Sequence, residues 1–132
     1  MSVTMRYGSG RDSYGKSGSY GDSSLLHLAW ENPSPGNSFA AQTIDVDLTD
    51  YDWFAVRAKF SLATPQDLPL FIFSVDETGK YLFSVAGDTN RVGSRSITYN
   101  LANMTLAISD GYYNGSANNN SVIPLEIYGV KL

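Results

Sequence analysis

Residues 109–132 read SDGYYNGSANNNSVIPLEIYGVKL, and the two halves of this stretch have opposite character. Residues 109–121 are mostly Gly, Asn, Ser and Tyr without an apolar run, which predicts a loop. Residues 121–131 predict a strand in which two sets of side chains alternate: Val122, Pro124, Glu126 and Tyr128, and between them Ile123, Leu125, Ile127 and Gly129. An aromatic, amide-rich loop at the entrance of a rigid apolar strand is a common way to build a recognition surface.

Short apolar runs separated by turn residues predict further strands upstream of this stretch. The expected strands cover residues 25–30, 39–48, 53–62, 69–75, 80–86, 95–101 and 104–109, with residues 87–94 as a loop. In residues 39–48, Gln42, Ile44, Val46 and Leu48 alternate with Thr43, Asp45 and Asp47, the period of two of a half-buried antiparallel strand. In residues 53–62, Phe54, Val56, Ala58, Phe60 and Leu62 share one face, and Arg57 and Lys59 point the other way.

These runs give about eight strands at spacings of roughly 8–14 residues, and no window has the period of an amphipathic helix. Strands with one apolar face need a second sheet to cover them. We therefore expect residues 25–132 to form one all-β domain, an antiparallel two-sheet β-sandwich of jelly-roll-like character. A small barrel would give nearly the same pattern, and the strand order does not follow from the sequence.

Residues 1–24 differ in composition from the rest of the chain. They repeat a loose Tyr-Gly-Ser pattern, in which Tyr7, Tyr14 and Tyr20 are each followed directly by Gly. The segment has too few aliphatic side chains to form a core of its own, which predicts an irregular N-terminal arm. Two interpretations remain open: a disordered tail, or an anchoring arm that becomes ordered against a partner.

Composition excludes several classes of function. The net charge is −4 and no basic stripe occurs, which argues against nucleic-acid binding. The chain has no cysteine, so disulfides and thiolate metal sites are excluded. No apolar run approaches the roughly 18–20 residues of a membrane span. The opening MSVTMRYGSG lacks the apolar core of a secretory signal, so synthesis in the cytoplasm is expected.

No motif indicates an enzyme, a metal or a cofactor. His27 is the single histidine and lies inside an apolar run, and no nucleophile elbow or embedded carboxylate pair occurs. The acidic run DVDLTDYD at residues 45–52 lacks the Gly and the terminal Glu of a calcium loop. GRDSYGKS at residues 10–17 matches the phosphate-loop pattern but has no strand before it and no helix after it.

The remaining candidate is a saccharide-binding surface. Aromatic faces stack on the C–H surfaces of sugars, and amide side chains offer paired donors and acceptors to hydroxyl groups. The candidate glycan-binding residues are Tyr112, Tyr113, Asn114, Asn118, Asn119, Asn120 and Trp53. The alternative is that the Asn and Gly residues only supply the positive φ angles of a long hairpin loop.

Two segments carry a resemblance to a known family. They are LAWENPSPGNSFAAQTIDVDLTDYDWFAV and ITYNLANMTLAISDGYYNGSANNNSVIPLEIYGVKL. Together they resemble a domain common in tailed phages and prophages of Gram-positive hosts. The matching residues are Trp30, Asn32, Pro33, Pro35, Phe39, Ala40, Gln42, Thr43, Leu48 and Tyr51, then Ile108, Gly111, Tyr112, Tyr113, Asn114, Gly115, Asn118, Asn119, Asn120, Ile123, Pro124, Ile127, Tyr128, Gly129 and Lys131.

The resemblance covers residues 25–132, is weaker between 60 and 95, and implies a virion structural protein with a β-sandwich head domain, often trimeric. It points to a tail-fibre or baseplate-type component that attaches to host-surface polysaccharide. The alternative is a capsid decoration or head-fibre protein with a purely structural role. Residues 1–24 lie outside the resemblance and would dock the head domain onto other virion proteins. No catalytic residue or cofactor is implied.

Overall fold

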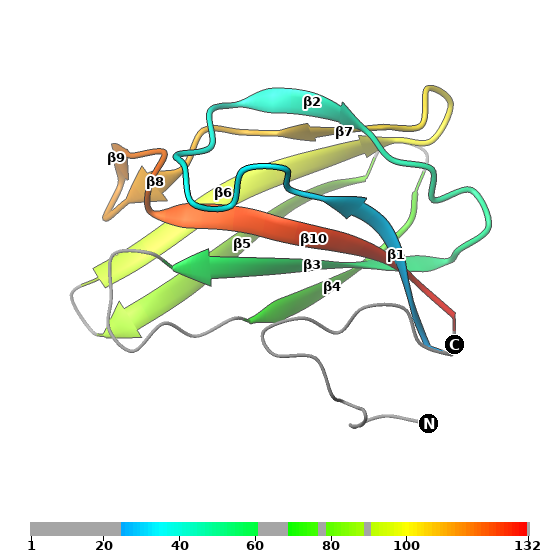
Figure 1. The fold of residues 1–132 in the computed structure, drawn as a ribbon, viewed down its shortest axis with the longest axis horizontal. Coiled ribbons are helices and arrows are strands. Elements are labelled where there is room, and N and C mark those ends of the chain that lie inside the picture. Colours follow the sequence, from blue (N-terminus) through cyan, green and yellow to red (C-terminus); the bar gives the residue numbers. More distant parts are fainter. Residues whose placement is uncertain (1–24, 61–68, 77–78, 89–90, 132) are drawn as a thin grey trace.

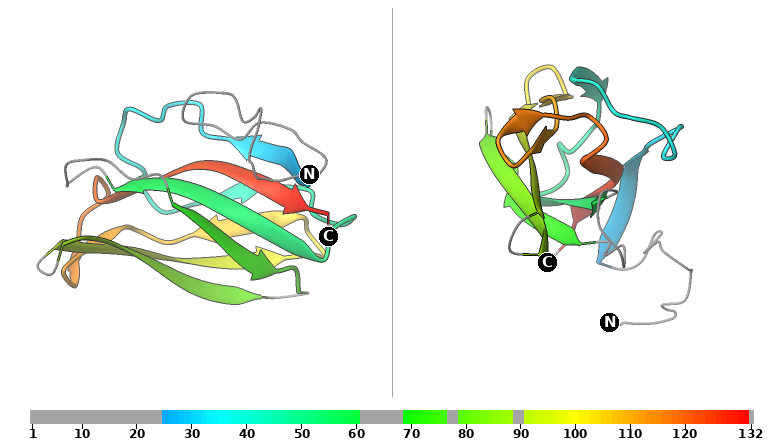
Figure 2. Two further views of the ribbon diagram at one scale, coloured as in Figure 1. Left: turned by 90° about the horizontal axis from the view of Figure 1, so that it is seen from below. Right: turned by 90° about the vertical axis from the view of Figure 1, so that its left-hand side faces the viewer.

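The computed structural model describes residues 25–60, 69–76, 79–88 and 91–131, and in these ranges the chain is all-β. Within these ranges ten strands form two antiparallel sheets, and Figure 1 shows the longer strands running roughly along the long axis of the molecule. The side and end views in Figure 2 show the sheets as two layers. The predicted antiparallel two-sheet sandwich is therefore confirmed. No helix occurs among the described residues, so none there is long enough to cross a bilayer.

Each sheet has a simple order. Sheet A runs β1 (Leu26–Glu31), β10 (Val122–Val130), β3 (Trp53–Phe60) and β4 (Leu70–Ser74). Sheet B runs β2 (Gln42–Asp45), β7 (Thr105–Ile108), β6 (Arg91–Asn100), β8 (Tyr112–Tyr113) and β9 (Ser116–Ala117), and β5 (Lys80–Asp88) also pairs with β6. The first strand pairs with the last in sheet A, and β2 pairs with β7 in sheet B. This nested pairing gives the sandwich its jelly-roll-like character.

The predicted closing strand lies inside sheet A rather than at its edge. β10 has β1 on one side and β3 on the other, and all nine of its residues are buried. The register shifts between Pro124 and Glu126, where proline lacks a backbone donor. The buried Asn32 occupies this irregularity: its Nδ2 donates to the Pro124 carbonyl at 2.8 Å, and its backbone N–H donates to the Leu125 carbonyl at 2.8 Å.

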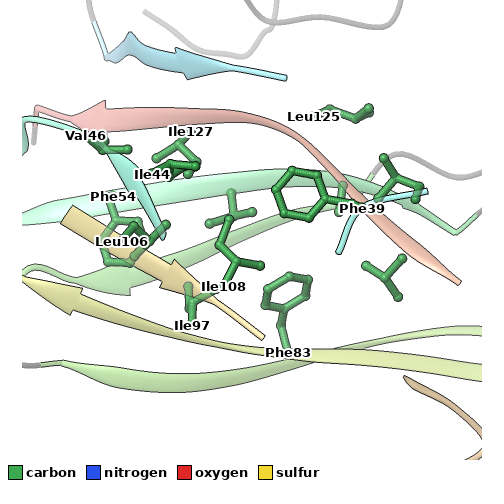
Figure 3. Close-up of a cluster of buried hydrophobic side chains, with 14 of the residues drawn as sticks. Phe39, Ile44, Val46, Phe54, Phe83, Ile97, Leu106, Ile108, Leu125 and Ile127 are labelled. Carbon is green, nitrogen blue, oxygen red and sulfur yellow. The ribbon is translucent and has the colours of Figure 1, made fainter. Parts of the chain in front are cut away.

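The core lies between the two sheets and draws side chains from both. In Figure 3, Phe54 and Ile127 come from sheet A, and Ile97 and Leu106 from sheet B. Tyr99 is fully buried with them; its hydroxyl donates to the Val46 carbonyl at 3.0 Å and accepts from the Leu48 N–H at 3.1 Å. Burial raises the pKa of Tyr99.

Two expectations need correction, and the burial of one side chain was not predicted. Only Gln42–Asp45 of the predicted strand 39–48 is paired as a strand, although Val46 and Leu48 continue the buried alternation. Residues 87–94 are not a loop throughout, because β5 extends to Asp88 and β6 begins at Arg91. Arg57 does point away from the core of the sandwich, as the alternation predicts, but its side chain is buried rather than solvated.

Candidate functional site

The Tyr/Asn segment, defined as residues 109–121, contains a two-stranded hairpin where the sequence predicted an open loop. β8 pairs with β9 through Tyr112 opposite Ala117 and Tyr113 opposite Ser116. The turn between them consists of Asn114 with φ 50° and Gly115 with φ 88°. Asn-Gly is the preferred pair for such a two-residue turn, because both positions need positive φ. That dipeptide is the sequence signal by which the hairpin could have been found.

The hairpin is fixed to sheet B by backbone pairing and by the side chain of Asn114. Gly93 pairs with Tyr113 and Ser94 with Tyr112. Asn114 donates its backbone N–H to the Val92 carbonyl at 2.8 Å, and its Oδ1 accepts from the Val92 N–H at 2.9 Å. The amide of Asn114 therefore holds the hairpin on β6.

Asn118 and Asn119 close the second half of the segment on itself. Asn119 Oδ1 accepts from the Gly111 N–H at 2.7 Å, and Asn119 Nδ2 donates to Asp110 Oδ1 at 3.1 Å. Asn118 Oδ1 accepts from the Asn120 N–H at 2.9 Å. These side chains satisfy backbone groups of the segment, whereas the positive φ of the alternative interpretation occurs at Asn114 and Gly115 and not at Asn118 or Asn119. The side-chain amides therefore mainly hold the backbone of the segment in place and do not project from its surface.

Arg95 is the central support of this segment, and sequence reasoning missed it. The side chain is fully buried and donates to four backbone carbonyls. The acceptors are Val122 (2.6 Å), Ser109 (2.6 Å), Phe39 (2.6 Å) and Asn119 (3.3 Å). The guanidinium carbon also lies 5.2 Å from the centre of the Phe39 ring. One cation thus joins β6, the start of β10, the end of β7 and both ends of the Tyr/Asn segment.

Arg95 keeps its positive charge although its side chain is buried. Desolvation lowers its pKa to about 10, and the nearby Asp110 carboxylate acts in the opposite direction. The group is therefore still protonated at neutral pH. The signal for its position is the alternation in β6, where Arg95 shares a face with Ile97 and Tyr99, both of them core residues.

The two tyrosines of the hairpin have different environments. Tyr113 is half-buried, and its ring centre lies 6.4 Å from that of Phe60 at an interplanar angle of 36°. Tyr112 leaves 41% of its surface exposed. Asn120 is also exposed, two residues before β10 begins. Tyr112 is therefore the aromatic face that the Tyr/Asn segment presents to solvent.

Trp53 does not belong to this site. It lies at the start of β3, where it pairs with Val130, whereas Phe60, which contacts Tyr113, lies at the other end of the same strand. Seven residues of strand separate the two positions by roughly 23 Å. Trp53 is 40% exposed, on a different part of the surface. The anchoring-arm residues Tyr7, Tyr14 and Tyr20 lie outside the described residues.

Two other titratable side chains, Asp47 and His27, have local structural partners. Asp47 Oδ1 accepts from the N–H and the hydroxyl of Thr49, and these hydrogen bonds lower the pKa of Asp47. The His27 ring packs at 5.7 Å from the Tyr51 ring. Within the described part of the chain, no three His, Cys, Asp or Glu residues are grouped as metal ligands.

The chain matches no family model, no curated protein and no solved structure. A function can therefore be argued only from the sequence motifs and from the geometry of the surface.

Proposed function

We propose that this chain is a phage virion structural protein whose head domain, residues 25–132, attaches to host-surface polysaccharide. Two observations support the proposal. The motifs that resemble the phage domain include the Tyr/Asn segment itself. Tyr112, the exposed aromatic residue of that segment, lies on a hairpin that Arg95 and Asn119 hold in place. The protein would act in the virion, as a tail-fibre or baseplate-type component without catalytic activity.

Rigidity of the hairpin is what favours a binding role for Tyr112. Stacking of a sugar on an aromatic ring contributes only a small binding free energy. The entropy lost when a mobile ring becomes ordered on binding therefore weakens the complex. Here the segment is ordered before any ligand arrives, by the four carbonyl bonds of Arg95 and by the bonds of Asn114 to Val92. The single observation that carries the proposal is this exposed ring on a preorganised support.

A purely structural role, as a capsid decoration or head-fibre protein, is the second candidate. The side chains of Asn114, Asn118 and Asn119 accept hydrogen bonds from backbone N–H groups of the protein itself. This favours the structural role, because few polar groups are then left for a saccharide. In both cases we propose that residues 1–24 contact other virion proteins and that the head domain assembles as a trimer. Sedimentation of the isolated protein tests the oligomeric state.

Binding to cell-wall polysaccharide from Gram-positive bacteria, on a glycan array or in a pull-down, tests the attachment function. We expect the wild-type protein to bind and Tyr112→Ala to lose most of that binding, because the stacking surface is removed. Trp53→Ala is the matched control, since it removes an aromatic of similar exposure at the opposite end of β3 and should leave binding unchanged.

Absence of binding by the wild-type protein, or equal binding by Tyr112→Ala, would favour the structural role. Circular dichroism of both variants shows whether they keep the strand content of the parent, so that a loss of binding is assigned to the ring and not to unfolding.

A further inference from the structure

The outer face of sheet A, the side turned away from sheet B, is unusually apolar. Directly opposed residues in antiparallel strands project to the same side, so the register identifies this face. It comprises the apolar residues Leu26, Leu28, Trp53, Ala55, Leu70, Ile72, Tyr128 and Val130, together with Arg57 and Glu126, and with Glu31, Lys59 and Ser74 toward the strand ends. Sheets with one solvated face normally carry polar side chains there.

The centre of this face is buried, whereas residues at its margin are exposed to solvent. Ala55 and Tyr128 are fully buried, whereas Leu28 is 41% and Ile72 56% exposed. Leu26, Ala55, Tyr128 and Val130 form a hydrophobic cluster separate from the core, and its partly buried neighbours are Leu25 and Leu70. All of these described residues belong to sheet A or directly precede it. In the register Tyr128 lies between Ala55 and Leu28.

A buried ion pair lies within the same face. Arg57 Nε and Glu126 Oε1 are 2.5 Å apart, and the Tyr128 hydroxyl donates to the same carboxylate oxygen at 3.2 Å. Arg57 is only 4% exposed, and its Nη1 is buried without a hydrogen-bond partner. A buried guanidinium N–H without an acceptor is unfavourable, and such groups are rare in folded proteins. The face therefore needs both an apolar cover and an acceptor oxygen near Arg57.

Residues 1–24 have the position, the length and the chemistry for this role. They lead into Leu25, whose carbonyl accepts from the Lys131 N–H at 2.9 Å. The side chain of Leu25 packs against the hydrophobic cluster of Leu26, Ala55, Tyr128 and Val130. An extended segment of that length reaches roughly 80 Å, far more than the width of four strands at about 4.8 Å spacing. Residues 61–68 connect Phe60 to Pro69, which precedes Leu70 of this face, but at eight residues they are a third of the length of residues 1–24.

The composition of residues 1–24 is complementary to this face. Tyr7, Tyr14 and Tyr20 supply apolar rings, and the glycines beside them allow the backbone to approach closely. Backbone carbonyls and the carboxylates of Asp12 and Asp22 supply acceptors for Arg57 Nη1. We propose that the outer face of sheet A is the docking surface for residues 1–24 of the same chain. This inference does not use the phage resemblance, and it gives residues 1–24 a contact other than the one to virion proteins proposed above.

Paramagnetic relaxation in the full-length protein tests the proposal. The chain has no cysteine, so Ile72→Cys accepts a single nitroxide label on the outer face of sheet A. Ala107→Cys is the matched control, because Ala107 is exposed on β7 between the core residues Leu106 and Ile108 and so faces outward from sheet B. We expect the label at position 72 to remove most of the amide signal intensity of residues 1–24, and the label at position 107 to leave it intact.

The outcomes are distinguishable. Unchanged signals of residues 1–24 with the label at position 72 would overturn the proposal, as would equal loss from both labels. A mixture of isotope-labelled protein without nitroxide and nitroxide-labelled protein without isotope identifies a second copy as the occupant. If the signal loss also occurs in that mixture, the face is an interface between copies, and docking within one chain is wrong; loss confined to the protein that carries both labels supports docking within one chain. None of these outcomes depends on polysaccharide binding, so the test is separate from that of the proposed function.

Discussion

Arg95 shows how a single side chain can organise a surface without touching a ligand. Each of its four acceptors is a backbone carbonyl, and they come from segments that are distant in sequence. A guanidinium group has five N–H donors in one plane, so it can hydrogen-bond to carbonyl oxygens of several segments at the same time. Asp110 compensates the charge nearby, while its Oδ1 accepts from the Ala41 N–H at 3.1 Å. The position of the Tyr/Asn segment therefore depends on this residue.

Replacing Arg95 by lysine keeps the charge but removes the fork. One ammonium group cannot reach the carbonyls of Phe39, Ser109 and Val122 together, so buried acceptors are left unpaired. We expect Arg95→Lys to lower the free energy of unfolding by about 2–4 kcal/mol in urea denaturation. Lys80→Met is the control: Lys80 is exposed on the adjacent strand β5, and its loss should change stability by less than about 0.5 kcal/mol. Equal effects of the two changes would show that Arg95 is not a structural support.

The hairpin β8–β9 shows what strand prediction from apolar patterns overlooks. Residues 112–117 read YYNGSA, which contain no apolar alternation, and the hairpin is stabilised by its Asn-Gly turn and its pairing with β6. The strands with alternating apolar residues were predicted, because one face of each packs on the core. The burial of Arg57 and Arg95 was not predicted for the same reason, since an apolar pattern says nothing about where a charged side chain finds its partners. Only the tertiary partners of these two arginines account for their burial.

Gly111 is a position at which packing within the segment leaves no room for a side chain. A Cβ there would lie 2.6 Å from the Asn118 carbonyl oxygen and 3.0 Å from Arg95 Nη2. Because the first of these atoms is backbone, Gly111→Ala must displace the segment, and we expect a loss of about 1–3 kcal/mol in stability. Gly36→Ala is the matched control, because a Cβ at Gly36 meets no atom within 4 Å. Thermal and urea unfolding of both variants measure the difference, and an unchanged Gly111→Ala protein would contradict the described packing of the segment.

At the scale of the whole molecule, the sequence predicts the class of fold but not its topology. Composition and alternation lead to an antiparallel sandwich, which the structure confirms. Strand order depends on which apolar faces meet, and nothing local in the sequence determines that choice. The tyrosines and asparagines named for the candidate site lie together in the Tyr/Asn segment, but Trp53 lies at the other end of β3, because position along the chain gives no position in space.

The pairing of β1 with β10 has a consequence for the rate of folding. Leu26 lies opposite Val130, so forming sheet A requires closure of nearly the whole described chain before this contact is gained. The neighbouring pair β10 and β3 is also distant in sequence, with Trp53 opposite Val130. Proteins dominated by such non-local contacts fold on the order of milliseconds to seconds, much more slowly than helical bundles of similar stability. Stopped-flow refolding from urea should give a rate in that range, and a microsecond phase accounting for all of the signal would contradict it. Until β10 is in place, β1 and β3 each present an unpaired edge, so aggregation competes with folding in that interval.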